Sequence, residues 1–173
     1  MMGRIEVEQI IRHFNLKPLP GEGGLFVQAY RASESISKGA LPARYPASKT
    51  FCTSIFYLLT SDLDSFSALH KLPTDEIYHF YLGDPVEMLI LHPAGRGERV
   101  ILGPNFLDGQ HVQIVVPRGV WQGSHLIPGG RFALLGTTMA PGYDDTDYTG
   151  GRREELAAQY PEHAELIRQL TRE

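Results

Sequence analysis

Short runs of alternating apolar and polar residues dominate the chain. Such runs cover Leu25–Tyr30, Thr50–Leu59, Glu76–Leu82 and Val86–Leu91, and four more follow at 99–102, 111–116, 120–127 and 132–139. Alternation with a period of two places every second side chain on one face, which is typical of β-strands. With glycine and proline between the runs and no helical pattern inside them, the chain is predicted to form an antiparallel sandwich or barrel.

The pattern changes at both ends of this β-rich region. Apolar residues recur at helical spacing in Val7–Phe14, and again in 153–160 and 162–170, where Pro161 starts the second of two C-terminal helices. The apolar sides of the C-terminal helices are expected to pack on the barrel. Gly83-Asp84-Pro85, between two predicted strands, has hairpin-turn residues.

Composition narrows the class of protein. The 173 residues, of which 42% are apolar and 21% charged, suit one domain spanning 1–173. The net charge of −4 comes without a run of Lys and Arg, so we expect no nucleic-acid partner. No segment approaches the roughly 20 apolar residues that cross a bilayer, and the first residues lack a secretory pattern. Cys52 is the only cysteine, so a reducing cytoplasm is the expected compartment.

Two motifs carry the chemistry. His70 is followed by Glu76 six positions on and by Gly83 seven positions after that, and Pro117-Arg118-Gly119 comes shortly before Gln122. With these motifs the chain resembles the cupin superfamily, and within it the group named domain of unknown function 985, whose members are often labelled sugar epimerases. The closer resemblance rests on 21–24, 67–70, 75–84, 116–123 and 140–142.

The resemblance implies an all-β fold, the cupin double-stranded β-helix or jelly-roll barrel, with a short N-terminal helix and C-terminal helices. In cupins the Glu of the first motif points into the barrel. Strand parity then places Glu76, Tyr78 and Phe80 inside, and Ile77, His79 and Tyr81 outside. By the same rule Gln122 and Ser124 face inward, while Trp121 and His125 face away.

A metal-binding cupin supplies three His and one Glu, which suit Fe, Mn, Ni or Zn. Here His70 and Glu76 match that set, but Leu72 and Gln122 stand where the other two His would be. Leu cannot ligate, and an amide oxygen binds transition metals less firmly than imidazole. We therefore expect no cofactor. The alternative is a divalent transition metal held by His70, Glu76 and Gln122.

Proton-transfer chemistry requires a base, a donor for the developing enolate and an acid. His70, Glu76 and Tyr78 are the catalytic candidates: His70 as base, Glu76 to fix its tautomer, and Tyr78, or else Tyr57, as acid. The ligand-binding candidates face the same pocket and are Gln122, Ser124, Tyr57, Phe80 and Glu22. A buried structural pair is the alternative for His70 and Glu76.

The sequence therefore predicts a small-molecule-binding cupin, acting as a sugar or sugar-nucleotide epimerase or isomerase by metal-independent proton transfer. The alternatives are a non-catalytic ligand-binding cupin and a metal-dependent isomerase or oxygenase. A homodimer is expected by analogy with other cupins, because an outer sheet face with Ile77, Tyr81 and Trp121 needs cover.

Overall fold

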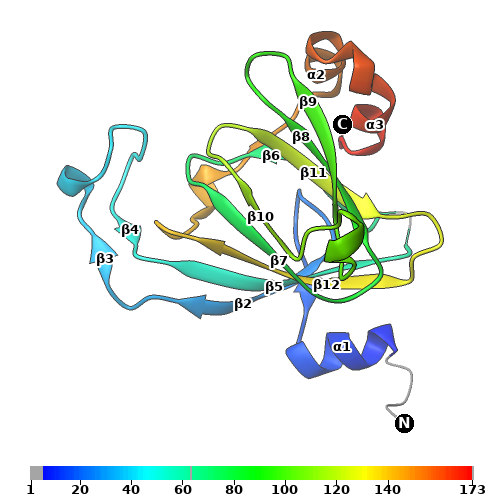
Figure 1. Ribbon diagram of the computed structural model, residues 1–173. Coiled ribbons are helices and arrows are strands. Elements are labelled where there is room, and N and C mark those ends of the chain that lie inside the picture. Colours follow the sequence, from blue (N-terminus) through cyan, green and yellow to red (C-terminus); the bar gives the residue numbers. More distant parts are fainter. Residues whose placement is uncertain (1–5, 63, 173) are drawn as a thin grey trace.

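The computed structural model describes residues 6–62 and 64–172, and two antiparallel sheets dominate it. The sheets lie face to face and form a jelly-roll barrel (Figure 1). The six-stranded sheet consists, in spatial order, of β1 (Lys17–Pro18), β2 (Leu25–Arg31), β5 (Thr53–Thr60), β12 (Phe132–Met139), β7 (Glu76–Gly83) and β10 (Gln113–Val116). The five-stranded sheet consists of β13 (Thr149–Gly150), β6 (Phe66–Lys71), β11 (Trp121–Leu126), β8 (Val86–Leu91) and β9 (Gly97–Leu102).

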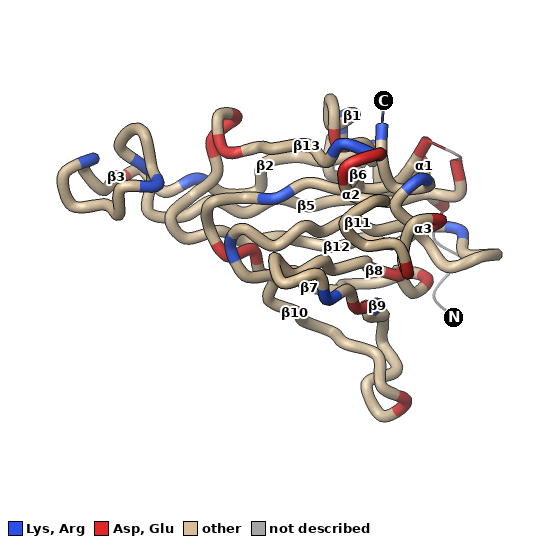
Figure 2. The backbone as a smooth tube through the Cα atoms, turned by 90° about the horizontal axis from the view of Figure 1, so that it is seen from above, with Lys and Arg blue, Asp and Glu red and all other residues tan. Residues whose placement is uncertain are grey.

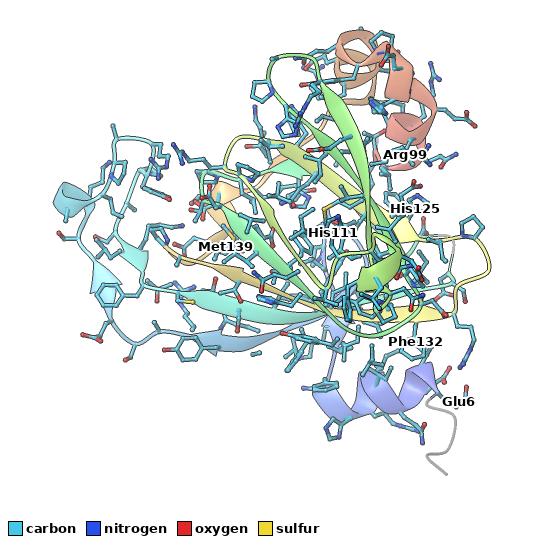
Figure 3. The ribbon with its side chains drawn as sticks, in the orientation of Figure 1. Glu6, Arg99, His111, His125, Phe132 and Met139 are labelled. Atoms are coloured by element: carbon cyan, nitrogen blue, oxygen red, sulfur yellow. The ribbon has the colours of Figure 1, made fainter. Side chains whose placement is uncertain are left out.

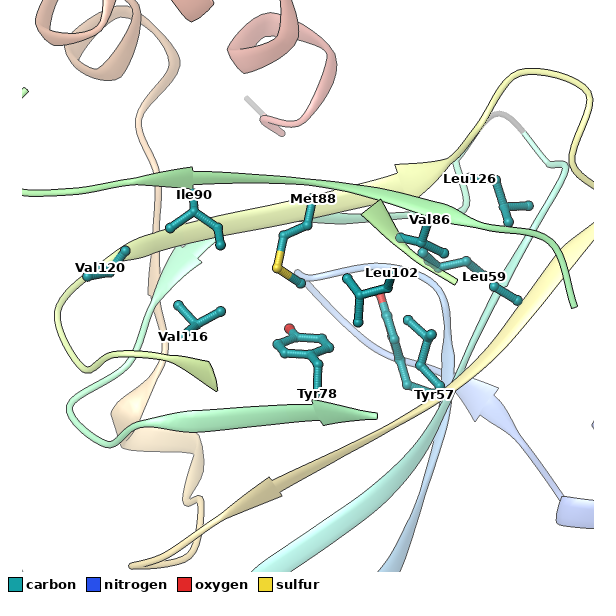
Figure 4. Packing of buried hydrophobic residues seen from close by; sticks show 12 residues of the cluster. Tyr57, Leu59, Tyr78, Val86, Met88, Ile90, Leu102, Val116, Val120 and Leu126 are labelled. Carbon is teal, nitrogen blue, oxygen red and sulfur yellow. The ribbon is translucent and has the colours of Figure 1, made fainter. Parts of the chain in front are cut away.

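The main core fills the space between the sheets. Tyr57 and Tyr78 rise from the six-stranded sheet toward Met88 and Ile90 of the opposite sheet (Figure 4). These four side chains are buried, and burying a large apolar side chain contributes about 1.5–3 kcal/mol. The inward positions of Glu76, Tyr78, Gln122 and Ser124 agree with the strand parity, since all four are buried.

Helices cover the outer faces of both sheets. Helix α1 (Val7–Phe14) lies under the six-stranded sheet, where Ile10 packs with Leu58 and Leu134. Helices α2 (Arg153–Gln159) and α3 (Ala164–Gln169) cover the five-stranded sheet (Figure 1). Their apolar side chains pack against Trp121. Short 3₁₀ turns form η1 (Lys38–Ala40), η2 (Phe106–Asp108), η3 (Asp145–Asp147) and η4 (Pro161–His163). No helix in the described ranges has the length and apolar character needed to cross a membrane.

The predicted hairpin at Gly83-Asp84-Pro85 is wrong. Strand β7 belongs to the six-stranded sheet and β8 to the five-stranded sheet, so the chain crosses between sheets at this point. Strand β12 already pairs with β7 up to Gly83, where a Cβ would lie 2.3 Å from the Phe132 carbonyl oxygen. Gly83 also has φ +107, which only glycine adopts readily. Gly83 is therefore required where the chain passes from one sheet to the other. Such a connection uses the same turn residues as a hairpin, so the sequence does not distinguish the two.

The predicted strand Thr50–Leu59 is two strands. Strand β4 (Lys49–Thr50) pairs with β3 (Ser35–Ile36) in an arm that projects from the barrel, and β5 begins at Thr53 (Figure 1). Half-exposed Phe51 separates them. The apolar run continues through the bend, so periodicity alone does not show where the chain enters the barrel. Strand β6, which carries His70, was not predicted as a strand.

Candidate functional site

A cavity of about 440 Å³ opens between the two sheets on the β2–β5 side of the barrel. Apolar side chains and carboxylates share its wall, and Met139, labelled in Figure 3, lies on it at the end of β12. The polar and charged side chains of the lining include Glu22, Arg31, Tyr57, His70, Glu76, Tyr143, Asp144 and Asp145, and Leu72 is among the apolar ones. The volume lies within the range of about 300–1,000 Å³ that is typical of small-molecule sites.

The glycine-rich loop before β2 brings Glu22 to this cavity. The Ala68 amide donates to the Glu22 carbonyl over 2.9 Å, and the Tyr57 hydroxyl donates to the Gly23 carbonyl over 2.9 Å. Gly24 has φ +68, and a Cβ there would lie 2.7 Å from the Tyr57 hydroxyl. The loop is therefore held against the barrel wall, with the Glu22 carboxylate beside His70 and Glu76.

His70 is almost fully buried, with 1% of its surface exposed. Its Nδ1 lies 2.8 Å from the Ala68 carbonyl oxygen, so Nδ1 carries a proton in either charge state. Its Nε2 lies 3.3 Å from Gln122 Nε2 and 3.9 Å from Glu76 Oε2. A neutral His70 accepts a hydrogen bond from the Gln122 amide at Nε2, whereas a protonated His70 needs Nε2 to face an acceptor.

Two carboxylates set the charge of His70. Burial disfavours the charged imidazolium, but Glu22 and Glu76 outweigh burial and raise the pKa of His70 to about 9. At neutral pH the ring is thus mainly an imidazolium between two acids. Such a group donates a proton more readily than it accepts one, which suits a general acid or a cationic donor.

The pKa of the Glu22 carboxyl group is also raised. Burial raises the pKa of Glu22, His70 opposes the rise, and Glu76 adds to it. One oxygen of Glu22 accepts a 2.8 Å hydrogen bond from the Ser67 hydroxyl. A carboxylate with a raised pKa at the wall of a cavity is suited to accept a proton from a bound molecule.

The structure divides the predicted site residues into two groups. Glu22, Tyr57, His70 and Glu76 line the cavity. Gln122 lies behind it and donates to Glu76 Oε2 over 2.6 Å, so it acts on the cavity through Glu76. The other three lie away from the cavity wall: Tyr78 in the main core, Phe80 packed against that core, and Ser124 buried with an Oγ that no described residue hydrogen-bonds.

Several cavity residues were not expected from the sequence. The loop after Pro141 contributes Tyr143, Asp144 and Asp145, and the end of β2 contributes Arg31. The Tyr148 ring also stacks on His70, with 5.2 Å between ring centroids. The polar sequence after Pro141 predicts a loop but not its place in the fold. The loop reaches the cavity mouth because β13 pairs with β6.

Ion pairs fix the mouth of the cavity. Arg31 binds Asp144 over 2.9 Å, and Lys49 binds Asp144 over 3.0 Å and also binds Asp147. Lys49 is 2% exposed although it carries a charge, so its two acidic partners are needed to offset its desolvation. These contacts tie the projecting arm to the loop after β12 across the cavity entrance.

The donor set does not fit a transition metal. Leu72 lines the cavity where the resemblance places a second His, and Gln122 presents its amide nitrogen, not its oxygen, to Glu76. Within residues 6–62 and 64–172 no three His, Cys, Asp or Glu side chains are grouped so that they could hold a metal ion. The residues that remain at the wall are one imidazole and two carboxylates.

Known proteins are similar to this chain in sequence or in fold. Uncharacterized protein YML079W of Saccharomyces cerevisiae is 27% identical over 149 residues, which cover 82% of this chain and 70% of the yeast protein. The crystal structure of protein SO0799 from Shewanella oneidensis is 26% identical, with a TM-score of 0.84 over 98% of this chain and 99% of that chain. A hypothetical protein from Leishmania major is 24% identical, with a TM-score of 0.84 over 98% of this chain and all of that one (100%).

The fold extends to more distant proteins. Oxalate decarboxylase from Bacillus subtilis is 14% identical, with a TM-score of 0.50 over 91% of this chain and 37% of that chain, and shares the fold alone. Residues 8–150 match the family described as Cupin superfamily (DUF985). That match covers most of the chain, so the protein belongs to this cupin family.

Proposed function

We propose that the cavity binds a small polar molecule and catalyses proton transfer on it without a metal. The observation that carries the proposal is the His70 imidazole placed between Glu22 and Glu76 at the wall of a 440 Å³ cavity. Burial raises the pKa of Glu22, and the neighbouring Glu22 and Glu76 carboxylates raise the pKa of His70. Groups of this kind, gathered in a cavity, are characteristic of acid–base sites.

The roles follow from the charges. In the reaction we propose, the Glu22 carboxylate removes a proton from a carbon next to a carbonyl group. The His70 imidazolium donates a hydrogen bond to the developing enolate oxygen, which lowers the barrier where the charge appears. The hydroxyl of Tyr57 remains protonated because burial raises its pKa, and it is the candidate for returning a proton to the other face of the enolate. It would give up its hydrogen bond to the Gly23 carbonyl in doing so, and the phenolate would recover a proton from water while Glu22 releases its own to water. Epimerisation or isomerisation of a sugar needs these three functions.

Solvent exchange tests the catalysis directly. The protein is incubated in deuterium oxide with a panel of monosaccharides, keto sugars and sugar nucleotides, and deuterium incorporation is followed by mass spectrometry. We expect one ligand class to exchange, with the rate reduced at least 100-fold in Glu22→Gln and His70→Gln. His125→Gln is the matched control, since His125 pairs with Glu87 on the outer face of β11. Equal exchange in all variants would contradict the assigned roles.

A non-catalytic binding protein is the second candidate. It is favoured by the burial of His70, which is 1% exposed and covered on one face by the Tyr148 ring. In that case the His70–Glu76 contact stabilises the wall, and Glu22 alone contacts the ligand. Tight binding of a ligand that shows no exchange would identify this function.

A homodimer also stays a prediction. The outer face of the six-stranded sheet exposes Tyr81 and Val115, at 49% and 48%, beyond the part covered by α1. Trp121, expected on the same face, is on the five-stranded sheet and packs against α2 and α3. The proposed contact is thus limited to strands β7 and β10, whose exposed residues would pair about a two-fold axis.

A further inference from the structure

We infer that the ligand of this cavity is a small hydroxylated amine, whose ammonium group binds beside Glu22 and Glu76. The inference rests on the proposed ligand-binding function and narrows its substrate class. It is carried by the hydrogen-bonding capacity and the charge of the cavity wall. Both indicate a ligand that supplies donors and positive charge.

The wall has an acceptor that no described residue satisfies. Glu22 uses one oxygen for the Ser67 hydroxyl, and Glu76 uses Oε2 for the Gln122 amide. The second oxygen of Glu22 receives no hydrogen bond from the residues that the structure describes, whereas Glu76 also faces the Tyr78 hydroxyl and His70. An ammonium group has three N–H donors, so it can bind the free Glu22 oxygen and be attracted by the charge of Glu76 at the same time.

The cationic groups near the cavity are already engaged. The Arg31 guanidinium donates to Asp144 over 2.9 Å and to the Tyr143 carbonyl over 3.2 Å. The Lys49 ammonium is held by Asp144 and Asp147. The positive charge of His70 is balanced by Glu22 and Glu76, although its Nε2–H stays free to donate a hydrogen bond to a ligand oxygen. A phosphate or carboxylate entering the cavity would have to displace one of these partners before it found a cation whose charge is not already balanced.

The balance of charge points the same way. The lining contains the carboxylates of Glu22, Glu76, Asp144 and Asp145, but only Arg31 and His70 as cations. Figure 2 shows acidic and basic positions over the whole molecule, and carboxylates outnumber cationic groups in the lining of the cavity. A diphosphate would meet repulsion from unpaired carboxylates, whereas an ammonium would be attracted.

The remaining wall fits a compact organic body. Leu19, Phe26, Ile55 and Met139 provide apolar surface opposite the carboxylates. An aromatic ring such as that of Phe26 attracts a cation as well as the apolar face of a sugar ring. A molecule of the size of one amino sugar uses both surfaces, while a nucleotide diphosphate would add negative charge.

Four probes that differ in charge test the inference. Binding of D-glucosamine, D-glucose, D-glucuronate and UDP-glucose is measured by calorimetry in mildly acidic, low-salt buffer, where the amine is charged. We expect D-glucosamine to bind at least tenfold more tightly than D-glucose, and D-glucuronate and UDP-glucose to bind more weakly than either. The preference should fall to below threefold in Glu22→Gln and persist in Glu98→Gln, which alters a surface acid paired with His92.

The outcomes separate the inference from the function on which it rests. Equal binding of D-glucose and D-glucosamine, or tighter binding of UDP-glucose, overturns the cationic ligand but keeps a sugar-binding cavity. Failure of all four probes to bind counts against the sugar-binding function itself and against the inference with it. A preference that survives in Glu22→Gln would show that the ammonium binds elsewhere and would overturn the assigned site.

Discussion

The Gln122 side-chain amide donates a hydrogen bond to the Glu76 carboxylate, with 2.6 Å between Nε2 and Oε2. The same nitrogen lies 3.3 Å from His70 Nε2. When His70 is protonated at Nε2, two N–H groups face each other, and the imidazolium must compete with Gln122 for Glu76. Gln122 could instead turn its Oε1, which is buried and without a described partner, toward the ring, at the cost of the bond to Glu76.

Stability should depend on pH through His70. The folded-state pKa of His70 is about 9, above the ordinary 6.5, so the charged form stabilises the folded protein. This contribution is complete below about pH 6.5 and is lost as the pH rises through about 9. The loss amounts to a few kcal/mol, since one pKa unit corresponds to about 1.4 kcal/mol. Urea unfolding of the protein and of His70→Gln across this range measures it. Parallel pH profiles for the two proteins would contradict the raised pKa.

Two substitutions should move the pKa of His70 in opposite directions. Glu22→Gln removes a nearby negative charge and should lower it by about one unit or more. Gln122→Met removes the amide that competes for Glu76 and should raise it. The imidazole signals of the protein in NMR titrations report both shifts. The same direction for both variants would show that packing, not charge and competition, controls His70.

Restoring the missing imidazoles should create a metal site. Leu72→His and Gln122→His together would give the three His and one Glu that metal-binding cupins use. We expect the double variant to bind Co²⁺ more tightly than the original protein, by a factor on the order of 100 or more. The visible absorption of bound Co²⁺ during a titration measures the affinity. His125→Gln made in the same background is the control, because it lies outside the cavity. Equal Co²⁺ affinity with and without the two His would show that the backbone does not bring these positions together.

The C-terminal helices should contribute to stability as part of the core. Ile167 of α3 is fully buried in the cluster that covers Leu69 and Leu89 of the five-stranded sheet. Ile167→Ala should reduce the free energy of unfolding by about 2–5 kcal/mol. Gln169→Ala, at an exposed position of the same helix, is the control and should change it by less than about 0.5 kcal/mol. Thermal and urea unfolding measure both. A small effect of Ile167→Ala would mean that α3 detaches easily from the sheet.

The dimer prediction can be tested at Val115. Sedimentation velocity at micromolar concentration should show a two-subunit particle. Val115→Glu, which places a charge on the exposed face of β10, should give monomers. Leu107→Glu, at an 87% exposed position outside the strands, should leave the association unchanged. A monomeric starting protein, or dissociation by both variants alike, would remove the β7–β10 face from consideration.

The strand-rich barrel, the helices at both ends and the inward faces of the two motif strands could all be predicted before the structure was known. The strands and helices follow from local periodicity. Which face of the motif strands points inward was implied by the family resemblance, and parity then placed the neighbouring residues. The sequence also brought His70 and Glu76 together through the family resemblance. Glycine-rich segments could be recognised as turns, but the residues that these turns contact could not be predicted.

The groups that surround His70 could not all be predicted, because they come from distant parts of the chain. Glu22 reaches it from a loop 48 positions earlier in the chain (70 − 22), and Tyr148 from a loop after the last long strand. The change of sheet at Gly83 depends on which strands pair with one another. The covering of Trp121 depends on where α2 and α3 pack on the five-stranded sheet. Periodicity carries information over a few residues, whereas the charge of a buried imidazole depends on groups brought together by folding.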